Sequence, residues 1–316
     1  MRVLVTGGCG FIGTNLCARL MGQGHIVTVL DKNLDGGLTR AVSSRLQLVR
    51  GDIRHEPDIE AVAGGQDTVI HLAAAGSVAE SVADPAANFR TNVVGTFNVL
   101  SAARRAGVGK VVLASTGGAL VGDAPPPVHE ETLPRPVSPY GASKLCAEAY
   151  AHAFGGAYGL ETVALRFSNV YGPESAHKNG AVTTFIRAVL NRDPMLIFGD
   201  GSATRDFIHV TDLCDGIASA ATTSLAPGTV LHLSSGHEIS ILDLARMIAR
   251  VAGAPNHPII FASKRAGEVE RNFARYDRAA MLLGFRPKRT LEEGLAETVE
   301  WFSRSFGVPQ PALAAQ

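Results

Sequence analysis

Residues 3–13 read Val3-Leu4-Val5-Thr6-Gly7-Gly8-Cys9-Gly10-Phe11-Ile12-Gly13, an apolar strand followed by a glycine-rich turn and the start of a helix. Gly7 permits a tight turn, Gly10 lets the backbone approach a pyrophosphate, and Gly13 allows the helix to pack closely on the strand. A phosphate bound here lies at the positive end of the helix. The pattern predicts a dinucleotide site formed by Gly7, Gly10, Phe11, Ile12 and Gly13.

An acidic residue ends the second apolar segment. Asp31 follows the first glycine of the turn by 24 residues, where a carboxylate accepts both ribose hydroxyls of an adenosine; the alternative is an ordinary turn residue. Because a carboxylate repels a 2′-phosphate, we expect NAD, although Lys32, in Asp31-Lys32-Asn33, leaves NADP open. After the third strand, Asp52 and Ile53 are expected to border the adenine, with helix capping as the alternative role of Asp52.

Short β-branched segments alternate with helical patterns through the first half of the chain. This predicts an α/β fold with a Rossmann-type, doubly wound parallel sheet. Strands are expected at Val3–Thr6, Ile26–Leu30, Leu46–Val49, Thr68–Leu72, Val111–Ser115 and Thr162–Arg166. The 316 residues exceed the ~250–300 at which single cores usually divide. We expect an NAD-binding domain over 1–170 and mainly a smaller C-terminal α/β substrate lobe over 171–316, with a segment near 204–235 returning to the sheet through a strand at Thr229–Leu233.

The composition argues against several functional classes. Lys+Arg and Asp+Glu both number 29, so no basic surplus indicates nucleic acid or an anionic membrane. No apolar run reaches the ~18 residues of a membrane span, and the first residues enter a strand instead of a signal peptide. Neither the histidines nor the four cysteines show metal-ligand spacing. We therefore expect no metal, and reduced thiols in a cytoplasmic protein.

Two helices are expected near the middle of the chain. Asp84 can cap the first and Pro85 suits its first position, while Gly107 closes it. Its apolar stripe consists of Phe89, Val93, Phe97 and Leu100. The second helix begins at Ser138-Pro139.

Tyr140 and Lys144, on this second helix, lie about one turn apart on the same face. A phenol titrates near ~10 and is no base at neutral pH. An ammonium beside it favours the phenolate, so the pair is a candidate acid/base site. Taken alone, the spacing also fits two unrelated surface neighbours.

Together with further motifs, these residues resemble the extended short-chain dehydrogenase/reductase family, and within it the sugar-nucleotide epimerases and dehydratases, most closely the bacterial UDP-glucose 4-epimerase group. The resemblance covers nearly the whole chain. Its motifs include His71-Leu72-Ala73-Ala74, Thr91-Asn92-Val93-Val94-Gly95-Thr96, Ser138-Pro139-Tyr140-Gly141-Ala142-Ser143-Lys144, Arg166-Phe167-Ser168-Asn169-Val170-Tyr171-Gly172-Pro173 and Arg205-Asp206-Phe207-Ile208-His209-Val210-Thr211-Asp212.

The resemblance implies a role for each catalytic residue. Tyr140 is the base, and Lys144 binds the nicotinamide ribose and depresses the pKa of the tyrosine. A hydroxyl at the end of the fifth strand assists; Thr116 is our choice and Ser115 the alternative. Relatives that are 4,6-dehydratases carry an Asp-Glu pair after that hydroxyl, whereas this chain has Gly117-Gly118. The dehydratase reaction is therefore disfavoured.

The resemblance also implies binding residues for both ligands. For the sugar nucleotide, Asn169 contacts the diphosphate, Arg205 and Arg265 clamp the phosphates, Glu268 accepts from a ribose hydroxyl, and Phe198 packs on the uracil; Ser77, Thr116, Tyr140 and Val182 complete this set. The cofactor set adds Leu72, Ala73, Ala74, Asn92, Ser115, Tyr140 and Lys144 to the residues named above. Asn92 is expected to hydrogen-bond the backbone near Tyr140.

The expected function is an NAD-dependent 4-epimerase of a UDP-sugar of the UDP-glucose/UDP-galactose type, working through a transient 4-keto sugar. His177 and Lys178 lie in a loop at the expected pocket mouth and suit a C6 carboxylate, so a UDP-glucuronic acid 4-epimerase is an alternative. Further alternatives are an NAD(P)H-dependent keto-sugar-nucleotide reductase, a 4,6-dehydratase and a non-catalytic NAD-binding sensor or scaffold. The helices Phe89–Leu100 and Tyr140–Phe154 are expected to pair with their copies in a homodimer, as in the family.

Overall fold

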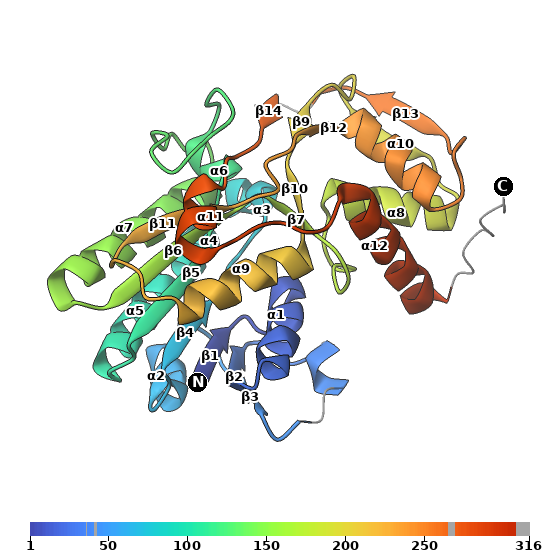
Figure 1. Ribbon diagram of the computed structural model, residues 1–316. Helices are drawn as coiled ribbons and strands as arrows, with labels where there is room; N and C mark the ends of the chain where they lie inside the picture. Colours follow the sequence, from blue (N-terminus) through green and yellow to red (C-terminus); the bar gives the residue numbers. More distant parts are fainter. Residues whose placement is uncertain (36, 41–42, 265–268, 308–316) are drawn as a thin grey trace.

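A parallel seven-stranded sheet forms the centre of the molecule, with strand order β11-β6-β5-β4-β1-β2-β3 (Figure 1). The computed structural model describes residues 1–35, 37–40, 43–264 and 269–307. The strands are β1 (Arg2–Thr6), β2 (Ile26–Asp31), β3 (Leu46–Arg50), β4 (Thr68–His71), β5 (Lys110–Thr116), β6 (Glu161–Phe167) and β11 (Thr229–Leu233). The predicted Rossmann-type sheet is confirmed, including the strand at Thr229–Leu233, which pairs with β6.

Helices cover both faces of this sheet. They are α1 (Phe11–Gly22), α2 (Glu56–Ala63), α5 (Gly95–Arg105), α7 (Pro139–Tyr158) and α9 (Val210–Thr222). Alternate residues of β1 separate the two cores: Val3 and Val5 pack in the cluster with α1 and α9, and Leu4 packs in the cluster with α2, α5 and α7. Burial on both faces explains why the middle residues of the central strands are consecutive apolar side chains, as in Val3-Leu4-Val5 of β1.

The order of the strands reverses beside β1, because β2 lies on one side of it and β4 on the other. In open parallel sheets, ligands bind at the carboxyl ends of the strands where the order reverses. The glycine turn follows β1 and the segment Leu72–Ala74 follows β4. The topology therefore brings both predicted cofactor segments to one point.

The helix predicted after Asp84 is interrupted. The chain forms α3 (Val78–Ala83), α4 (Pro85–Phe89), a π-helical turn at Arg90–Val94 and then α5. The Asp84 carboxylate accepts a hydrogen bond from the backbone N–H of Ala87 at 2.8 Å, as its capping role predicts. The predicted stripe is not a single buried face, because Leu100 is buried whereas Phe89 and Phe97 are exposed.

The remaining elements mostly form a second cluster beside the carboxyl ends of the sheet (Figure 1). Its helices are α8 (Ala181–Asn191), α10 (Ile241–Val251) and α12 (Leu291–Phe306), with α6 (Gly118–Val121) and α11 (Asp277–Leu283) lying against the first lobe. Small sheets join β7 (Asn169–Tyr171) to β10 (Phe207–His209), β8 (Met195–Phe198) to β13 (Ile259–Ala262), and β9 (Thr204–Arg205) to both β12 (Ile239–Ser240) and β14 (Arg271–Asn272). The division at residue 170 stays a prediction. In the part of the chain that the structure describes, no helix has the length and apolar character to cross a bilayer.

Candidate active site

The glycine turn closes tightly around its own backbone. Gly7 has φ 73°, and a Cβ atom on it would lie 2.6 Å from the Ala73 nitrogen; one on Gly13 would lie 2.4 Å from the Gly7 oxygen. A Cβ on Gly10 would touch only the Gly7 oxygen, at 3.4 Å, so this side of the turn is bare backbone. Gly10 caps α1, whose first-turn N–H groups lack partners within the helix. Bare backbone beside these donors suits a pyrophosphate.

The carboxylate of Asp31 lies beside this turn. It accepts hydrogen bonds from the backbone N–H of Cys9 at 3.0 Å and of Asn33 at 3.1 Å. These bonds fix its direction, and a carboxylate retains acceptor capacity for ribose hydroxyls. Lys32 is exposed at the same strand end.

The residues expected at the adenine have other contacts in the structure. Arg54 donates hydrogen bonds to Asp52 through its side chain, which lowers the pKa of that carboxyl. Ile53 is buried, and its side chain packs against Gly95 of α5, where an added Cβ atom would lie only 2.6 Å from the Ile53 Cδ1 atom. An adenine contact by Asp52 and Ile53 therefore stays a prediction.

Asn92 lies in the π-helical turn and binds the segment after β4. Its amide oxygen accepts from the Ala75 N–H at 2.8 Å, and its amide nitrogen donates to the Ala75 oxygen at 3.1 Å and to the Ser143 hydroxyl at 3.0 Å. Ser143 in turn donates to the Tyr140 carbonyl at 2.7 Å. The predicted contact with the backbone near Tyr140 is thus wrong in detail, because the Ser143 hydroxyl lies between the two.

Tyr140 lies in the first turn of α7 and its phenol faces β5. The Ser138 hydroxyl caps the helix by accepting from the Gly141 N–H at 3.1 Å. Burial raises the pKa of Tyr140 to about 12, while a hydrogen bond from the Thr116 side chain acts in the opposite direction. Ser115 points elsewhere and donates to Glu148 at 2.5 Å. Of the two candidate hydroxyls, the structure brings Thr116 to the phenol.

Lys144 lies one turn further along α7 and is also buried. Its Nζ atom donates to the Ala114 carbonyl at 2.9 Å and lies 5.9 Å from the centroid of the Tyr140 ring. Burial lowers the pKa of Lys144 to about 8, and the negative charge of Glu148 opposes this. The predicted lowering of the Tyr140 pKa by Lys144 is not seen among the described residues, because desolvation of the phenol raises that pKa.

His71, at the end of β4, is a site residue that the sequence reasoning did not single out. Its ring is buried and contacts the hydroxyls of Thr6 at 2.7 Å and Thr96 at 3.0 Å. Burial and the nearby Lys144 lower the pKa of His71 to about 3, so the ring is neutral at physiological pH. The sequence feature that could have identified His71 is a polar residue at the end of an otherwise buried strand.

The Gly117-Gly118 pair lets side chains from later in the sequence approach the end of β5. A Cβ atom on Gly118 would lie 2.4 Å from the Asn272 amide nitrogen, and one on Gly117 would lie 3.4 Å from the His232 ring. Asn272 belongs to β14, so this contact joins the second lobe to the segment that follows Thr116. The sequence shows no spacing that would have identified Asn272.

Three predicted substrate residues make contacts within the chain itself. Ser77 caps α3 by accepting from the Glu80 N–H at 3.2 Å, and Val182 is buried in α8. The Asn169 amide donates to the Asp206 carbonyl at 3.0 Å, which ties β7 to β10. These contacts leave the predicted roles in substrate binding untested.

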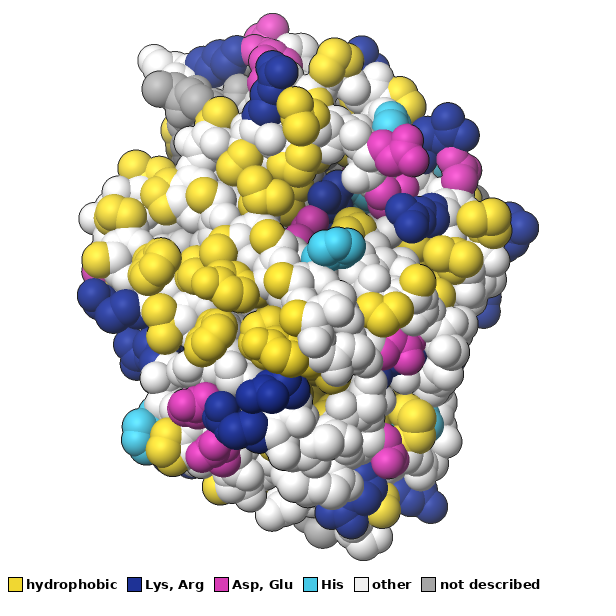
Figure 2. Space-filling model, turned by 90° about the vertical axis from the view of Figure 1, so that its left-hand side faces the viewer, with side chains coloured by type: hydrophobic (Ala, Val, Ile, Leu, Met, Phe, Trp, Pro, Cys, Tyr) yellow, Lys and Arg dark blue, Asp and Glu magenta, His cyan; other side chains and the backbone are white. Residues whose placement is uncertain are grey.

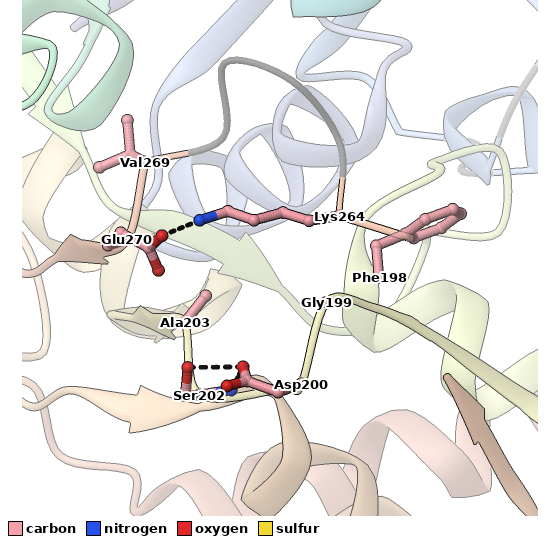
Figure 3. A pocket seen from close by; sticks show the side chains of 8 residues that line it. All are labelled: Phe198, Gly199, Asp200, Ser202, Ala203, Lys264, Val269 and Glu270. Atoms are coloured by element: carbon pink, nitrogen blue, oxygen red, sulfur yellow. Dashed lines mark hydrogen bonds and ion pairs between the residues drawn. The ribbon is translucent and has the colours of Figure 1, made fainter. Parts of the chain in front are cut away.

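A pocket of about 330 Å³ lies in the second lobe, at the ends of β8 and β9 (Figure 3). Its lining residues are Phe198, Gly199, Asp200, Ser202, Ala203, Lys264, Val269 and Glu270. Lys264 and Glu270 form an ion pair across it. Phe198, the predicted uracil contact, lies in this lining, whereas Arg205 donates to the Thr204 carbonyl at 2.7 Å nearby. Arg265 and Glu268 lie outside the described residues.

The loop after β7 carries His177 and Lys178. Desolvation by neighbouring atoms lowers the pKa of Lys178, and the negative charge of Glu80, on α3, opposes this. Desolvation by neighbouring atoms lowers the pKa of His177, and the positive charges of Lys178 and Arg187 lower it further. Lys178 thus lies within electrostatic reach of α3. Within residues 1–35, 37–40, 43–264 and 269–307, no group of three or more His, Cys, Asp or Glu side chains is arranged to hold a metal ion.

The chain matches known proteins along its length. A model of the NAD dependent epimerase/dehydratase family matches residues 3–233. A UDP-glucose 4-epimerase of Mycolicibacterium smegmatis is 38% identical over 312 residues, which cover 96% of this chain and 98% of the relative. Curated relatives also include dTDP-glucose 4,6-dehydratases, one of them from Actinoplanes sp. at 35% identity over 96% of this chain and 98% of its own.

Solved structures agree with the sequence matches. The UDP-glucose 4-epimerase of Thermotoga maritima, with UDP-glucose, has a TM-score of 0.91 at 33% identity and covers 97% of this chain and 100% of its own. The UDP-glucuronic acid 4-epimerase of Bacillus cereus, in complex with UDP-glucuronic acid and NAD, has a TM-score of 0.90 at 30% identity, with 96% and 100% covered. With a glycine turn, an acid at the ribose position and a Tyr-Lys pair in place, the chain belongs to the NAD-dependent epimerase/dehydratase family and takes NAD as its cofactor.

Proposed function

We propose that this enzyme is a 4-epimerase of a UDP-sugar of the UDP-glucose/UDP-galactose type, acting through a transient 4-keto sugar. The carrying observation is the end of β5, where Thr116 meets the Tyr140 phenol and is followed by Gly117-Gly118. Epimerisation at C4 needs one base and a hydride carrier. A 4,6-dehydratase needs further groups to move protons at C5 and C6, and two glycines supply none.

The chemistry assigned to the chain's own residues is acid/base work at the sugar 4-hydroxyl. When bound, NAD would supply the hydride acceptor and donor for C4 of the sugar, and its oxidised ring would add a positive charge; the glycine turn and Asp31 would hold it. Tyr140 takes the hydroxyl proton, directly or through Thr116, and gives it back after the keto sugar has turned. Burial opposes ionisation of Tyr140, so the charge of Lys144 on the same helix face matters for the base.

The nucleotide is assigned to the pocket of the second lobe. Phe198 supplies an aromatic surface for the base, and Arg205 and Asn169 lie on neighbouring short strands. Affinity for the nucleotide does not change when the sugar turns, so both faces of the keto sugar can be presented. The assignments of Arg265 and Glu268 to this pocket remain predictions from the resemblance.

A second candidate is a UDP-glucuronic acid 4-epimerase. The observation that favours it is Lys178, a cation in the loop after β7 that lies within electrostatic reach of Glu80 on α3. A C6 carboxylate entering there would gain a partner of opposite charge. A solved structural relative of that specificity adds support.

We further propose that the enzyme is a homodimer. Figure 2 shows hydrophobic side chains gathered on the face that carries α5 and α7. Phe97 and Tyr150 are each 41% exposed there, and Phe89 and Tyr158 more so. Exposed apolar patches of this kind mark interaction sites. Light scattering after gel filtration should give twice the chain mass, and Phe97→Glu should shift it toward the monomer; a monomeric wild type contradicts the proposal.

One experiment distinguishes the enzymatic candidates. The purified protein is incubated with UDP-glucose, UDP-galactose, UDP-glucuronic acid, UDP-N-acetylglucosamine and dTDP-glucose, without added reductant, and each sugar is followed by proton NMR. Interconversion of C4 epimers is expected, most rapidly for UDP-glucose and UDP-galactose. Faster conversion of UDP-glucuronic acid would favour the second candidate, and loss of water from dTDP-glucose would indicate a dehydratase. If NAD is bound and no sugar changes at C4, the epimerase proposal fails. A separate reaction with NADPH and a keto-sugar nucleotide would then be run. Stoichiometric consumption of NADPH would indicate a reductase, and the absence of any turnover would indicate a sensor or scaffold.

A further inference from the structure

A buried ion pair lies behind the Tyr-Lys pair. Arg166 donates to Glu148 twice, from Nη2 to Oε2 at 2.8 Å and from Nε to Oε1 at 3.0 Å. The two side chains are 4% and 7% exposed. The Ser115 hydroxyl also donates to Oε1 of Glu148, at 2.5 Å. One carboxylate therefore holds three elements together, since Glu148 belongs to α7, Ser115 to β5 and Arg166 to β6.

The position of Glu148 along α7 gives this pair a second consequence. Tyr140, Lys144 and Glu148 follow each other at intervals of four residues, so all three lie on the helix face turned toward the sheet. Ser115, the β5 partner of Glu148, is the neighbour of Thr116, which meets the phenol. Glu148 thus fixes both the helix that carries the base and the strand end that carries the assisting hydroxyl.

Polar and charged groups from α7, β4, β5 and β6 surround Lys144. On its own helix lie the Tyr140 phenol and the Glu148 carboxylate; β4 contributes His71, which burial keeps neutral. The Lys144 ammonium donates a hydrogen bond to the neutral Ala114 carbonyl of β5 at 2.9 Å. The Arg166 guanidinium of β6 lies beyond Glu148 and carries charge of the same sign as Lys144.

Burial alone would drive the Lys144 amine toward its neutral form. A neutral amine gives a developing phenolate no charge stabilisation, so the base needs a fixed anion near Lys144. The Glu148 carboxylate is that anion, and its bidentate pairing with Arg166 makes its burial tolerable.

We propose that Glu148 is a positioning residue for this reaction, which holds Lys144 in its charged form and locks α7 onto β5 and β6. The inference rests on the proposed role of Tyr140 as base. Glu148 touches neither of the proposed reacting groups, since it acts through Lys144 and Ser115.

The test reads the charge of Lys144 directly. The chain contains six lysines, so NAD-loaded protein labelled with [ε-¹³C]lysine gives a spectrum simple enough to follow Lys144 by NMR while pH is raised; Lys144→Arg assigns its signal. In Glu148→Gln an anion is lost and Arg166 remains, so the deprotonation midpoint should fall by about one pH unit or more. In Arg166→Gln the buried Glu148 carboxylate loses its paired cation and is expected to take up a proton, so the midpoint should also fall. Arg166→Lys keeps a cation beside Glu148 and should leave the midpoint near the wild-type value.

The alkaline limb of the kcat–pH profile should move with these midpoints. Activity of Glu148→Gln should decline at lower pH than in wild type, with KM for the sugar nucleotide changed less than kcat. Glu148→Asp, which keeps the charge, should return the midpoint toward the wild-type value. Loss of packing alone would not be reversed by Glu148→Asp, which shortens the side chain and keeps only its charge.

A matched control lies at the other end of the same two strands. Lys110 of β5 and Glu161 of β6 form an ion pair at 2.8 Å in a mostly buried setting. Glu161→Gln breaks a mostly buried ion pair between β5 and β6, and it should leave the Lys144 midpoint unchanged. If Glu148→Gln does not fold, the double variant Glu148→Gln/Arg166→Gln replaces it, because no charge is then left unpaired, and its midpoint should also lie below the wild-type value.

Any other pattern overturns the proposal, including an unchanged midpoint in Glu148→Gln or an equal fall in Glu148→Asp. The NMR readout needs no substrate. A protein that epimerises no sugar but shows these shifts would retain the link between Glu148 and Lys144 and lose only the proposed reaction.

Discussion

The two ends of the proposed active site are built differently. At the catalytic end, Lys144 and Glu148 are buried, Tyr140 is half-buried, and each of the three bonds to a neighbouring strand. At the nucleotide end, Lys264 and Glu270 face each other across an open pocket with 54% and 56% of their side chains exposed. Buried ion pairs are costly to break, whereas exposed pairs contribute little. The reacting groups are therefore preorganised by the fold, and the groups at the nucleotide end are only loosely fixed within the chain.

The largest effect should come from removing the phenol at the catalytic end. Tyr140→Phe keeps the buried ring and loses only the hydroxyl that bonds to Thr116. We expect kcat to fall by roughly 10²–10⁴-fold, while the bound NAD, measured after denaturing the protein, stays at the wild-type amount. Near-normal turnover would remove Tyr140 as the base.

The next effect separates the two hydroxyls at the end of β5. Thr116→Val removes the hydrogen bond to the phenol, which should lower kcat by roughly 10- to 100-fold, the equivalent of one hydrogen bond to a charged group. Thr116→Ser retains a hydroxyl and should keep most of the activity. Equal loss in Val and Ser variants would show that the methyl packing, and not the hydroxyl, matters.

Acid should destabilise the catalytic end before the nucleotide end. Burial lowers the pKa of His71 and of His232 to about 3, below the ordinary value of 6.5. Between pH 6.5 and 3, these two histidines therefore bind protons in the unfolded chain but not in the folded one. The free energy of unfolding should fall progressively as pH decreases through this range. Urea denaturation at several pH values should show this decline. His71→Asn should reduce its slope by up to one proton, and an unchanged slope would contradict the assignment.

A smaller effect is expected where the two ends meet. Gly118→Ala would place a Cβ atom 2.4 Å from the Asn272 amide. Because a flexible side chain can move, we expect a loss of about 1–3 kcal/mol in the free energy of unfolding, together with a raised KM. Asn272→Ala should remove most of this cost in the double variant. Additive losses would show that the two residues do not interact.

The smallest effect should appear at the nucleotide end. Lys264→Ala breaks the exposed pair with Glu270, and the free energy of unfolding should change by less than about 1 kcal/mol. Chemical denaturation beside Glu148→Gln measures the contrast between the two ends. A loss at Lys264 as large as that at Glu148 would remove the distinction.

Local pattern was enough to predict the sheet and the cofactor turn. The strand before Gly7, the capping by Asp84 and the returning strand at Thr229–Leu233 all follow from periodicity, turn chemistry and helix-end preferences. The resemblance then named Tyr140 and Lys144. The site contacts that were missed or misjudged depend on distant segments.

Asn92 bonds the Ser143 hydroxyl and not the backbone near Tyr140, Asn272 of β14 lies beside Gly118, and Glu148 of α7 pairs with Arg166 of β6. Neither spacing nor propensity encodes such contacts, because each depends on how elements pack in three dimensions. The pKa of Tyr140 shows the same limit, since its direction depends on burial that a helix-face argument does not contain.

The position of β11 has a consequence for the order in which the protein is made. Strand β6 emerges from the ribosome long before β11, which follows only after α8 and the small strands of the second lobe. Until then, β6 is an unpaired sheet edge, the kind of surface that other chains can join. A nascent chain stopped after Ser168 cannot complete its sheet, so chaperone demand should peak during synthesis of the second lobe.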